Sequence, residues 1–296
     1  MRLTVHGTRG SYPVCRAGYN RFGGNTTCLF LRSGQDQIII DGGSGLLPLG
    51  DRLARDCDAR HRVHVFLTHP HWDHVVGFPF FRPAYDARFT ITIYGADSEN
   101  KKLEQIFQSQ YRSGSFPVAF DALPARMGFH RLQAGDEVRL VDTTVRCIQL
   151  NHPGMDLGYR FDSARGSIVI LTDLAPIVGN ILGLGMKERA ADHPHAFEQD
   201  YQSMLVDFIK GADLVLYDTN FTEEEIVGKQ HWGHSTPQEA LQVLGHLDAP
   251  PGLVLAHHDP DHDDACMDEI YRLAGRAGGS QGIDVFIAKE GGSFEL

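Results

Sequence analysis

Ten short runs of β-branched and apolar residues recur along the chain, and this recurrence sets the fold class. The runs are RLTVHG, CLFLRSG, QIIIDGG, HVFLTH, ITIYG, TTVRCIQL, SIVILTD, DLVLYD, GLVLAHH and DVFIAKE. Runs of this length that end near Gly, Asp or His are typical of buried strands. Helical stretches are predicted between them at 97–111, 197–210, 236–247 and 263–277. This alternation of strands and helices predicts an α/β fold.

No linker rich in Pro, Gly or Ser divides the 296 residues, so a single domain over 1–296 is expected. The stretch 174–211 is long for a connection between two strands. We interpret it as an inserted helical segment that could shape the mouth of a site.

The net charge and the cysteine content limit which partners and which cellular compartment are expected. The formal charge is −11, with 27 Lys and Arg against 38 Asp and Glu, which argues against a surface that tracks nucleic-acid phosphates without excluding it. Five scattered cysteines, at 15, 28, 57, 147 and 266, are typical of reduced thiols. The N-terminal segment has no apolar signal-like run, and no membrane span is expected. A cytoplasmic location is expected.

A dense group of histidines follows one of the apolar runs. In FLTHPHWDHVVG, which spans 66–77, the residues His69, His71, Asp73 and His74 occupy six consecutive positions. Buried imidazoles and carboxylates cost free energy unless they are paired or bound to a cation. The alternating spacing lets His69 and His71 converge on one cation while Asp73 and His74 face another. Two metals are therefore predicted from one segment.

Further metal ligands are available at the ends of other predicted strands. His152 follows TTVRCIQLN, Asp173 closes SIVILTD, and His257 closes GLVLA. With 16 histidines in the chain, any one of these alone is more often a surface residue than a ligand. Their shared position at strand ends, together with the cluster, favours ligation. Imidazole and carboxylate ligands suit zinc, and also manganese or iron.

These residues, in this order, resemble the ligand series of the metallo-β-lactamase superfamily, and IIIDGGSG at 38–45 resembles the strand and turn before it. The resemblance covers essentially the whole chain. It implies an αββα sandwich, here with the helical insertion around 174–211, and metals at one edge between the sheets. It also implies that one metal is held by His69, His71 and His152, the other by Asp73, His74 and His257, and that Asp173 bridges both.

Two divalent cations, of which Zn²⁺ is expected and Mn²⁺ or Fe²⁺ are alternatives, would supply hydrolytic chemistry. A metal pair about 3.5–4 Å apart lowers the pKa of bound water and stabilises charge on attacked and leaving oxygens. Asp41, at the end of QIIID, is a candidate to orient a liganding imidazole through its second N–H. The alternative for Asp41 is an ordinary turn aspartate before two glycines.

A second set of motifs resembles the phosphodiesterase branch that includes RNase Z and certain bacterial cyclic-nucleotide phosphodiesterases. The motifs are LVLYDTNFTEEE and GHSTPQEALQV. The resemblance implies that His234 protonates the leaving oxygen with support from Asp218, where RNase Z usually carries a glutamate. The GHSTP motif is also typical of a helix start, and both interpretations can hold. We assign catalytic roles to Asp73, His234 and Asp218.

Neighbouring polar residues are interpreted more simply. Arg160, in the GYRF segment, could meet a phosphate but is more typical of an outward strand arginine. Asp259 and His262, in AHHDPDHDD, are expected to be solvated loop residues rather than ligands.

The expected function is hydrolysis of a small phosphodiester by a metal-bound hydroxide, with a 3′,5′-cyclic nucleotide as the favoured substrate. The chain lacks the basic, Gly/Pro-rich arm with which RNase Z grips tRNA, which makes tRNA 3′-processing the alternative. Hydrolysis of a lactone or ester, and a noncatalytic metal-dependent sensor, are further alternatives. A homodimer is implied only by likeness to RNase Z.

Overall fold

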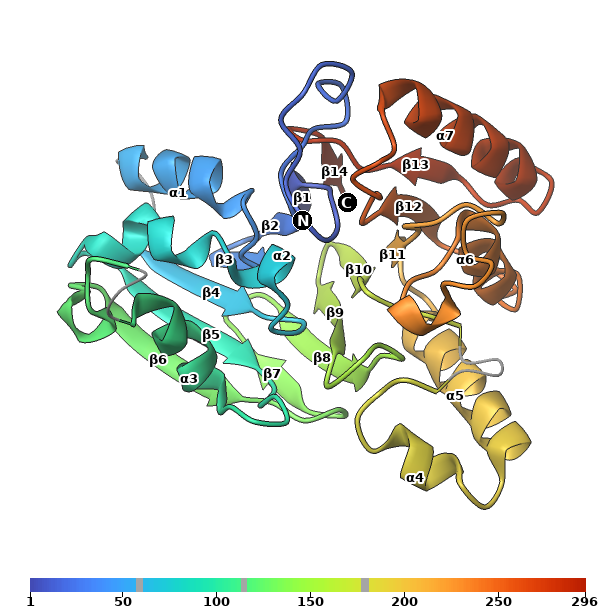
Figure 1. Cartoon of the computed structure of the whole chain (residues 1–296), viewed down its shortest axis with the longest axis horizontal. Coiled ribbons are helices and arrows are strands. Elements are labelled where there is room, and N and C mark those ends of the chain that lie inside the picture. Colours follow the sequence, from blue (N-terminus) through green and yellow to red (C-terminus); the bar gives the residue numbers. More distant parts are fainter. Residues whose placement is uncertain (57–60, 113–115, 177–180) are drawn as a thin grey trace.

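The computed structural model describes residues 1–56, 61–112, 116–176 and 181–296. In this part of the chain, two seven-stranded sheets lie face to face (Figure 1). The first sheet consists, in spatial order, of β14 (Ser293–Glu295), β1 (Arg2–Gly7), β2 (Cys28–Ser33), β3 (Asp36–Ile40), β4 (Arg62–Phe66), β5 (Thr90–Gly95) and β6 (Arg126–Arg131). Strands β3 to β6 pair in parallel, and β14 to β3 pair antiparallel.

The second sheet has a similar mixed topology. It consists, in spatial order, of β13 (Val285–Ile287), β12 (Gly252–Ala256), β11 (Leu214–Asp218), β10 (Gly166–Leu171), β9 (Leu157–Ser163), β8 (Thr144–Gln149) and β7 (Glu137–Arg139). Strand β9 is antiparallel to both β8 and β10, and β10 to β13 are parallel. Strands β8, β10, β11 and β12 therefore run in one direction, and their carboxyl ends lie along one edge of the sheet.

Helices cover the outer face of each sheet, and apolar side chains fill all three interfaces. The helices are α1 (Leu46–Arg55), α2 (Trp72–Val75), α3 (Leu103–Gln108), α4 (Met186–Ala190), α5 (Pro194–Ile209), α6 (Pro237–Leu244) and α7 (Asp264–Gly279). Short 3₁₀ turns span Phe78–Phe80, Arg82–Tyr85, Ser109–Tyr111, Phe120–Ala122 and Gln230–Trp232. Helices α1 and α3 pack on the first sheet, and α5, α6 and α7 on the second.

The core between the sheets is built from alternate strand residues. Leu3, Leu31 and Ile40 of the first sheet belong to one buried cluster with Phe161 and Leu216 of the second. On the central strands, the side chains that point away from this core pack against the helices. Both sheets are therefore buried on both faces. The predicted α/β sandwich of αββα type is confirmed.

All ten predicted strands are present, but four others were missed. Strands β6, β7, β9 and β14 carry isolated apolar residues among charged ones, so their sequences lack a continuous apolar run. The predicted helix over 97–111 was too long. Helix α3 begins only at Leu103, because Ser98 and Lys101 close a turn through their backbone and side-chain hydrogen bonds.

The predicted insertion at 174–211 is helical in its described part, which excludes 177–180. Helices α4 and α5 occupy it, and Tyr201 and Leu205 of α5 enter the outer core of the second sheet. Arg160 on β9 is buried rather than outward. Its Nη1 donates to the carbonyls of Phe208 and Lys210, 2.8 Å away in each case. This arginine therefore ends helix α5, which leaves it no role toward a phosphate.

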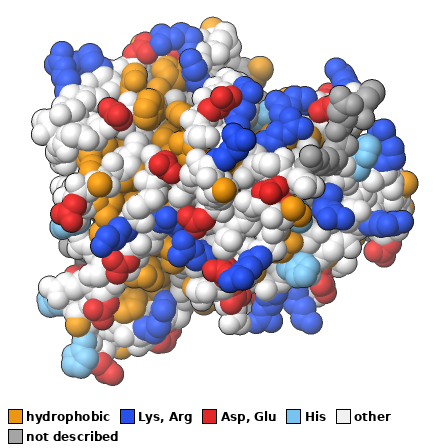
Figure 2. All heavy atoms as spheres, turned by 180° about the vertical axis from the view of Figure 1, so that it is seen from behind, with side chains coloured by type: hydrophobic (Ala, Val, Ile, Leu, Met, Phe, Trp, Pro, Cys, Tyr) orange, Lys and Arg blue, Asp and Glu red, His pale blue; other side chains and the backbone are white. Residues whose placement is uncertain are grey.

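No helix in the described ranges combines the length and apolar character that a membrane crossing requires. The face shown in Figure 2 carries Lys and Arg side chains interspersed with Asp and Glu, beside a band of hydrophobic side chains.

Tyr159 links the two sheets beneath the site, and its removal tests the packing. Its hydroxyl is fully buried and donates to the Leu67 carbonyl at 2.6 Å. Tyr159→Phe should lower the free energy of unfolding by about 1–2 kcal/mol, because the buried carbonyl loses its donor. Urea unfolding followed by circular dichroism measures this, with the half-exposed Tyr271→Phe as the control. Equal losses in the two variants would contradict the assignment.

Candidate metal centre and active site

Polar residues at the carboxyl ends of strands from both sheets meet in one place. Asp41 follows β3, Asp173 follows β10 and His257 follows β12, and each has a left-handed backbone with φ of 60°, 58° and 58° respectively. This conformation is strained for residues other than Gly, and such strain concentrates at functional sites. It turns the chain sharply at the strand end and holds the side chain at the sheet edge.

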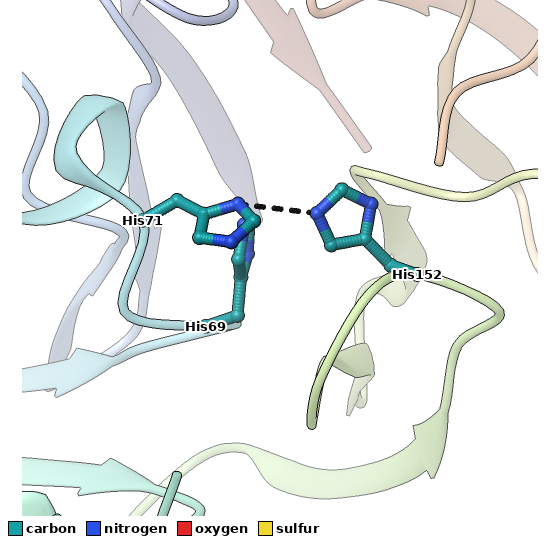
Figure 3. A group of neighbouring side chains, drawn as sticks. All are labelled: His69, His71 and His152. Carbon is teal, nitrogen blue, oxygen red and sulfur yellow. Dashed lines mark hydrogen bonds between the residues drawn. The ribbon is translucent and has the colours of Figure 1, made fainter. Parts of the chain in front are cut away.

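Three histidines form the first group of candidate ligands. Their ring nitrogens lie within 4.8 Å of one another, in His69, His71 and His152. Figure 3 shows His69 and His71, from the loop after β4, facing His152 across a gap, and His71 Nδ1 lies 3.2 Å from His152 Nε2. Burial lowers the pKa of His152 to about 3. The imidazole is therefore neutral, which is the form that binds a metal.

The second group contains two histidines and two aspartates, all buried. Its members, with ligand atoms within 4.8 Å of one another, are Asp73, His74, Asp173 and His257. His257 Nε2 lies 3.3 Å from Asp73 Oδ2 and 3.3 Å from Asp173 Oδ2. The six-residue cluster thus divides as predicted: its first two histidines belong to one group, and its aspartate and last histidine to the other.

The Asp173 carboxylate lies between the two groups. Its Oδ1 is 3.9 Å from the Nε2 atoms of both His69 and His152, and its Oδ2 is 3.1 Å from His74 Nε2. Among the described residues, Asp173 Oδ2, His69 Nε2 and His74 Nε2 are buried without any aligned hydrogen bond. Buried polar atoms rarely lack partners. The donor set therefore fits cations, with Asp173 placed to face both.

Asp41 holds one of the candidate ligands from behind. Its Oδ2 accepts a hydrogen bond from His74 Nδ1 at 2.8 Å, and Thr68 donates to both of its oxygens, from N at 2.8 Å and from Oγ1 at 2.9 Å. Nδ1 therefore carries the proton, and Nε2 of His74 is left with its lone pair toward Asp73 and Asp173. Of the two interpretations of Asp41, the structure favours the one that orients an imidazole.

Two supporting residues escaped the sequence analysis. Asp156 is fully buried, with Oδ2 3.5 Å from His69 Nδ1, and burial raises its pKa. Ser11 donates its backbone N–H to Asp73 Oδ2 at 2.8 Å from a left-handed turn. Asp156 carried no clear signal, because strand β9, which follows it, lacks a continuous apolar run. Ser11 acts through its backbone, so its side-chain identity gave none.

His234 and Asp218 form a buried pair beside this centre. His234 Nδ1 donates to Asp218 Oδ2 at 2.9 Å and lies 3.7 Å from Asp173 Oδ1. Burial alone would lower the pKa of His234, but the Asp218 and Asp173 carboxylates outweigh it and raise the pKa to about 9. Asp218 is itself fixed by the backbone N–H groups of Leu174 and Asn220, each at 3.0 Å.

The helix start predicted for the same motif is also present. Thr236 is the N-cap of α6 and forms a reciprocal capping box with Glu239, and Pro237 is the first helical residue. The cap fixes the backbone two residues after His234, so the two interpretations of the motif coexist.

The expectation for the loop after His257 was partly wrong. His262 is buried rather than solvated, and its Nε2 lies 3.0 Å from both carboxylate oxygens of Glu225. The carbonyls of Asp259 and His262 accept hydrogen bonds from the buried Arg9. Neither residue belongs to a group of candidate ligands in the described chain.

Known proteins of similar sequence cover nearly the whole chain. Ribonuclease Z of Haloarcula marismortui is 24% identical over 287 residues, which is 87% of this chain and 86% of that protein. Ribonuclease Z of Myxococcus xanthus is 25% identical over 297 residues, with 89% and 88% covered.

Solved structures confirm the fold. The metallo-β-lactamase fold protein YhfI of Bacillus subtilis superposes with a TM-score of 0.69 at 20% identity, covering 100% of this chain and 98% of that one. Human tRNase Z, short form, gives 0.64 at 18% identity, with 100% and 99% covered. Residues 37–192, more than half of the chain, match the family described as the beta-lactamase superfamily domain. The chain belongs to the metallo-β-lactamase superfamily.

Proposed function

We propose that this protein is a metal-dependent phosphodiesterase that holds two divalent cations and protonates its leaving group with His234. The observation that carries the proposal is the His234–Asp218 hydrogen bond of 2.9 Å beside the Asp173 carboxylate. Hydrolysis of an activated amide or lactone has less need of such an acid, whereas an alkoxide leaving from phosphorus is poor and gains from protonation.

We assign the two spatial groups of candidate ligands to two separate cations. One cation would be held by His69, His71 and His152, and the other by Asp73, His74 and His257, with Asp173 facing both. When bound, such cations activate water and neutralise charge on the phosphoryl oxygens. The imidazole and carboxylate mixture suits zinc, which we propose as the metal, while manganese and iron accept the same ligands.

The residues around this centre have separate tasks. His234 Nδ1 is committed to Asp218, so Nε2 is the atom that gives a proton to the leaving oxygen. Asp218 keeps the ring in this orientation and stabilises its charged form. Burial raises the pKa of Asp73, but His74 and His257 outweigh this and hold it well below the usual range. Asp73 therefore remains a carboxylate, suited to ligation and to accepting a hydrogen bond from substrate water.

Two substrate classes follow from different observations. The ribonuclease Z relatives, aligned over most of both chains, favour a phosphodiester of RNA. The net charge of −11 favours a small diester such as a 3′,5′-cyclic nucleotide, because extended RNA binding is driven by cationic side chains. We place the RNA-type substrate first, since the sequence similarity extends over most of both chains, and keep the cyclic nucleotide as the second candidate.

The role of His234 predicts a dependence on the leaving group. His234→Ala should slow cleavage of a dinucleotide, whose leaving alkoxide is basic, by about 10²–10⁴-fold. Cleavage of bis-p-nitrophenyl phosphate should fall far less, because p-nitrophenolate leaves without a proton. Steady-state kinetics of the zinc-loaded enzyme measure both, with the exposed neighbour His231→Ala as control. An equal loss on the two substrates would rule out the acid role, and no turnover above His69→Ala would reject the activity itself.

The Asp41–His74 hydrogen bond predicts that metal affinity depends on Asp41. Asp41→Asn preserves shape but removes the carboxylate that orients His74, and should weaken binding of a cation by about 10–100-fold. Competition with a fluorescent zinc chelator gives the affinities, and the exposed Asp248→Asn is the matched control. Unchanged affinity in Asp41→Asn would show that Asp41 only shapes the turn.

A direct comparison of cleavage rates distinguishes the two substrate classes. Precursor tRNA and a panel of 3′,5′-cyclic nucleotides should be compared on one zinc-loaded preparation. If RNA is the substrate, its cleavage should fall steeply between about 50 and 200 mM salt, whereas cleavage of a cyclic mononucleotide should change little. Precursor tRNA that stays intact at low salt, together with turnover of a cyclic nucleotide, would reverse our order of preference.

A further inference from the structure

We propose that a groove beside the metal-binding loop holds the nucleotide next to the scissile phosphate, so that the substrate carries a second phosphate and a base. The groove has a volume of about 520 Å³, within the range of small-molecule sites. Pro70, Trp72 and Val75 form one wall, and residues between 98 and 112 form the other. This inference rests on the proposed phosphodiester hydrolysis and narrows its substrate.

The groove lies beside the segment that carries the candidate ligands, because Pro70 and Trp72 line it and flank His71 in the chain. This residue stands between His71 and Asp73, so its Cα lies about 3.8 Å from theirs. The side chains of His71 and Asp73 belong to the two ligand groups, whereas the Trp72 side chain is 69% exposed and lines the groove. We infer that a ligand whose phosphate reaches the metal centre extends from there to Trp72.

Trp72 offers a stacking surface. The Trp72 side chain is exposed at the groove, so a bound ligand can cover it. Bases stack on aromatic rings irrespective of their sequence. Within the described chain, Trp72 makes no ring contact with another aromatic side chain, which leaves its faces free for a base.

The opposite wall is cationic. Lys101 and Arg112 both line the groove and are exposed, and none of the described residues that line it is acidic. Lys101 Nζ donates to Ser109 Oγ at 3.1 Å, and Arg112 has no ion pair with a described carboxylate. In a chain with a net charge of −11, two cations in one groove whose described lining contains no acidic residue fit a phosphate.

A polar side chain in the same wall also lacks partners. Both the oxygen and the nitrogen of the Gln110 amide are buried without a hydrogen bond among the described residues. Buried amides seldom remain unpaired, and this one belongs to a residue that lines the groove. There it could meet the edge of a base stacked on Trp72.

These features distinguish the two substrate candidates. A cyclic mononucleotide has one phosphate, which would be bound at the metal centre. No second phosphate would then remain for Lys101 and Arg112. A chain of at least two nucleotides places its second phosphate beside them and its base over Trp72. The groove therefore favours an oligonucleotide-type phosphodiester.

Chromogenic nucleotides test the second phosphate. Two substrates carry a second phosphate: thymidine 3′-phosphate 5′-(p-nitrophenyl phosphate) and its isomer with the two groups exchanged. The reference substrate, thymidine 5′-(p-nitrophenyl phosphate), lacks it. The zinc-loaded enzyme should hydrolyse one of the first two with a kcat/KM about tenfold higher than that for the reference. Replacing both cations, Lys101→Ala with Arg112→Ala, should remove this preference. The control, Lys187→Ala with Arg126→Ala, makes the same charge change at exposed positions outside the groove and should keep it.

Fluorescence tests the base contact without turnover. The chain has two tryptophans, so Trp232→Phe leaves Trp72 as the only one. Adenosine 3′,5′-bisphosphate should quench the emission of this zinc-loaded variant, and should not quench that of Trp72→Phe. Equal kcat/KM with and without the extra phosphate, or no quenching of Trp72, would overturn the groove assignment. Failure to hydrolyse any of the diesters would instead reject the proposed function.

Discussion

The buried carboxylate of Asp173 is the constraint on which the site depends. It is 1% exposed, it stands between two groups of imidazoles, and one of its oxygens has no aligned hydrogen bond in the described structure. An ionised carboxylate in such a place is costly unless cations or charged partners surround it. The neighbouring histidines lower its pKa in spite of its burial, so the negative charge is retained. A centre that keeps this charge is prepared to bind divalent cations.

The two-sheet architecture explains how distant segments reach this carboxylate. Strands β8, β10, β11 and β12 run in one direction, so their carboxyl ends share an edge, and β3 and β4 of the facing sheet bring Asp41 and the histidine cluster to the same edge. The left-handed backbones at Asp41, Asp173 and His257 cost free energy locally. The packed core on both faces of each sheet offsets that cost, and the ligands lie on short segments anchored to the ends of rigid strands.

Site residues and strands could be predicted from the sequence where the signal lies within a few neighbouring residues. The cluster at 69–74 and the strand-end residues His152, Asp173 and His257 were found because each lies directly after an apolar run. Strand β9 and the edge strand β14 were missed, because charged side chains interrupt their patterns. The burial of His262 depends on Glu225, 37 residues away, and Arg160 reaches helix α5, about 50 residues away. No local pattern encodes such partners.

Net charge is a poor guide to the substrate of a centre like this one. The −11 of the chain is a sum over the whole surface, and Lys, Arg, Asp and Glu are interspersed over the face in Figure 2. Surface charges further away than a Debye length, about 8 Å at physiological salt, are largely screened from a bound phosphate. Under the proposed function, two divalent cations would add four positive charges beside the Asp73 and Asp173 carboxylates, while Asp41 and Asp218 are hydrogen-bonded to histidines of the same centre. The charge that a phosphodiester meets at the edge between the sheets would then be set by these cations and their ligands rather than by the net charge of the chain.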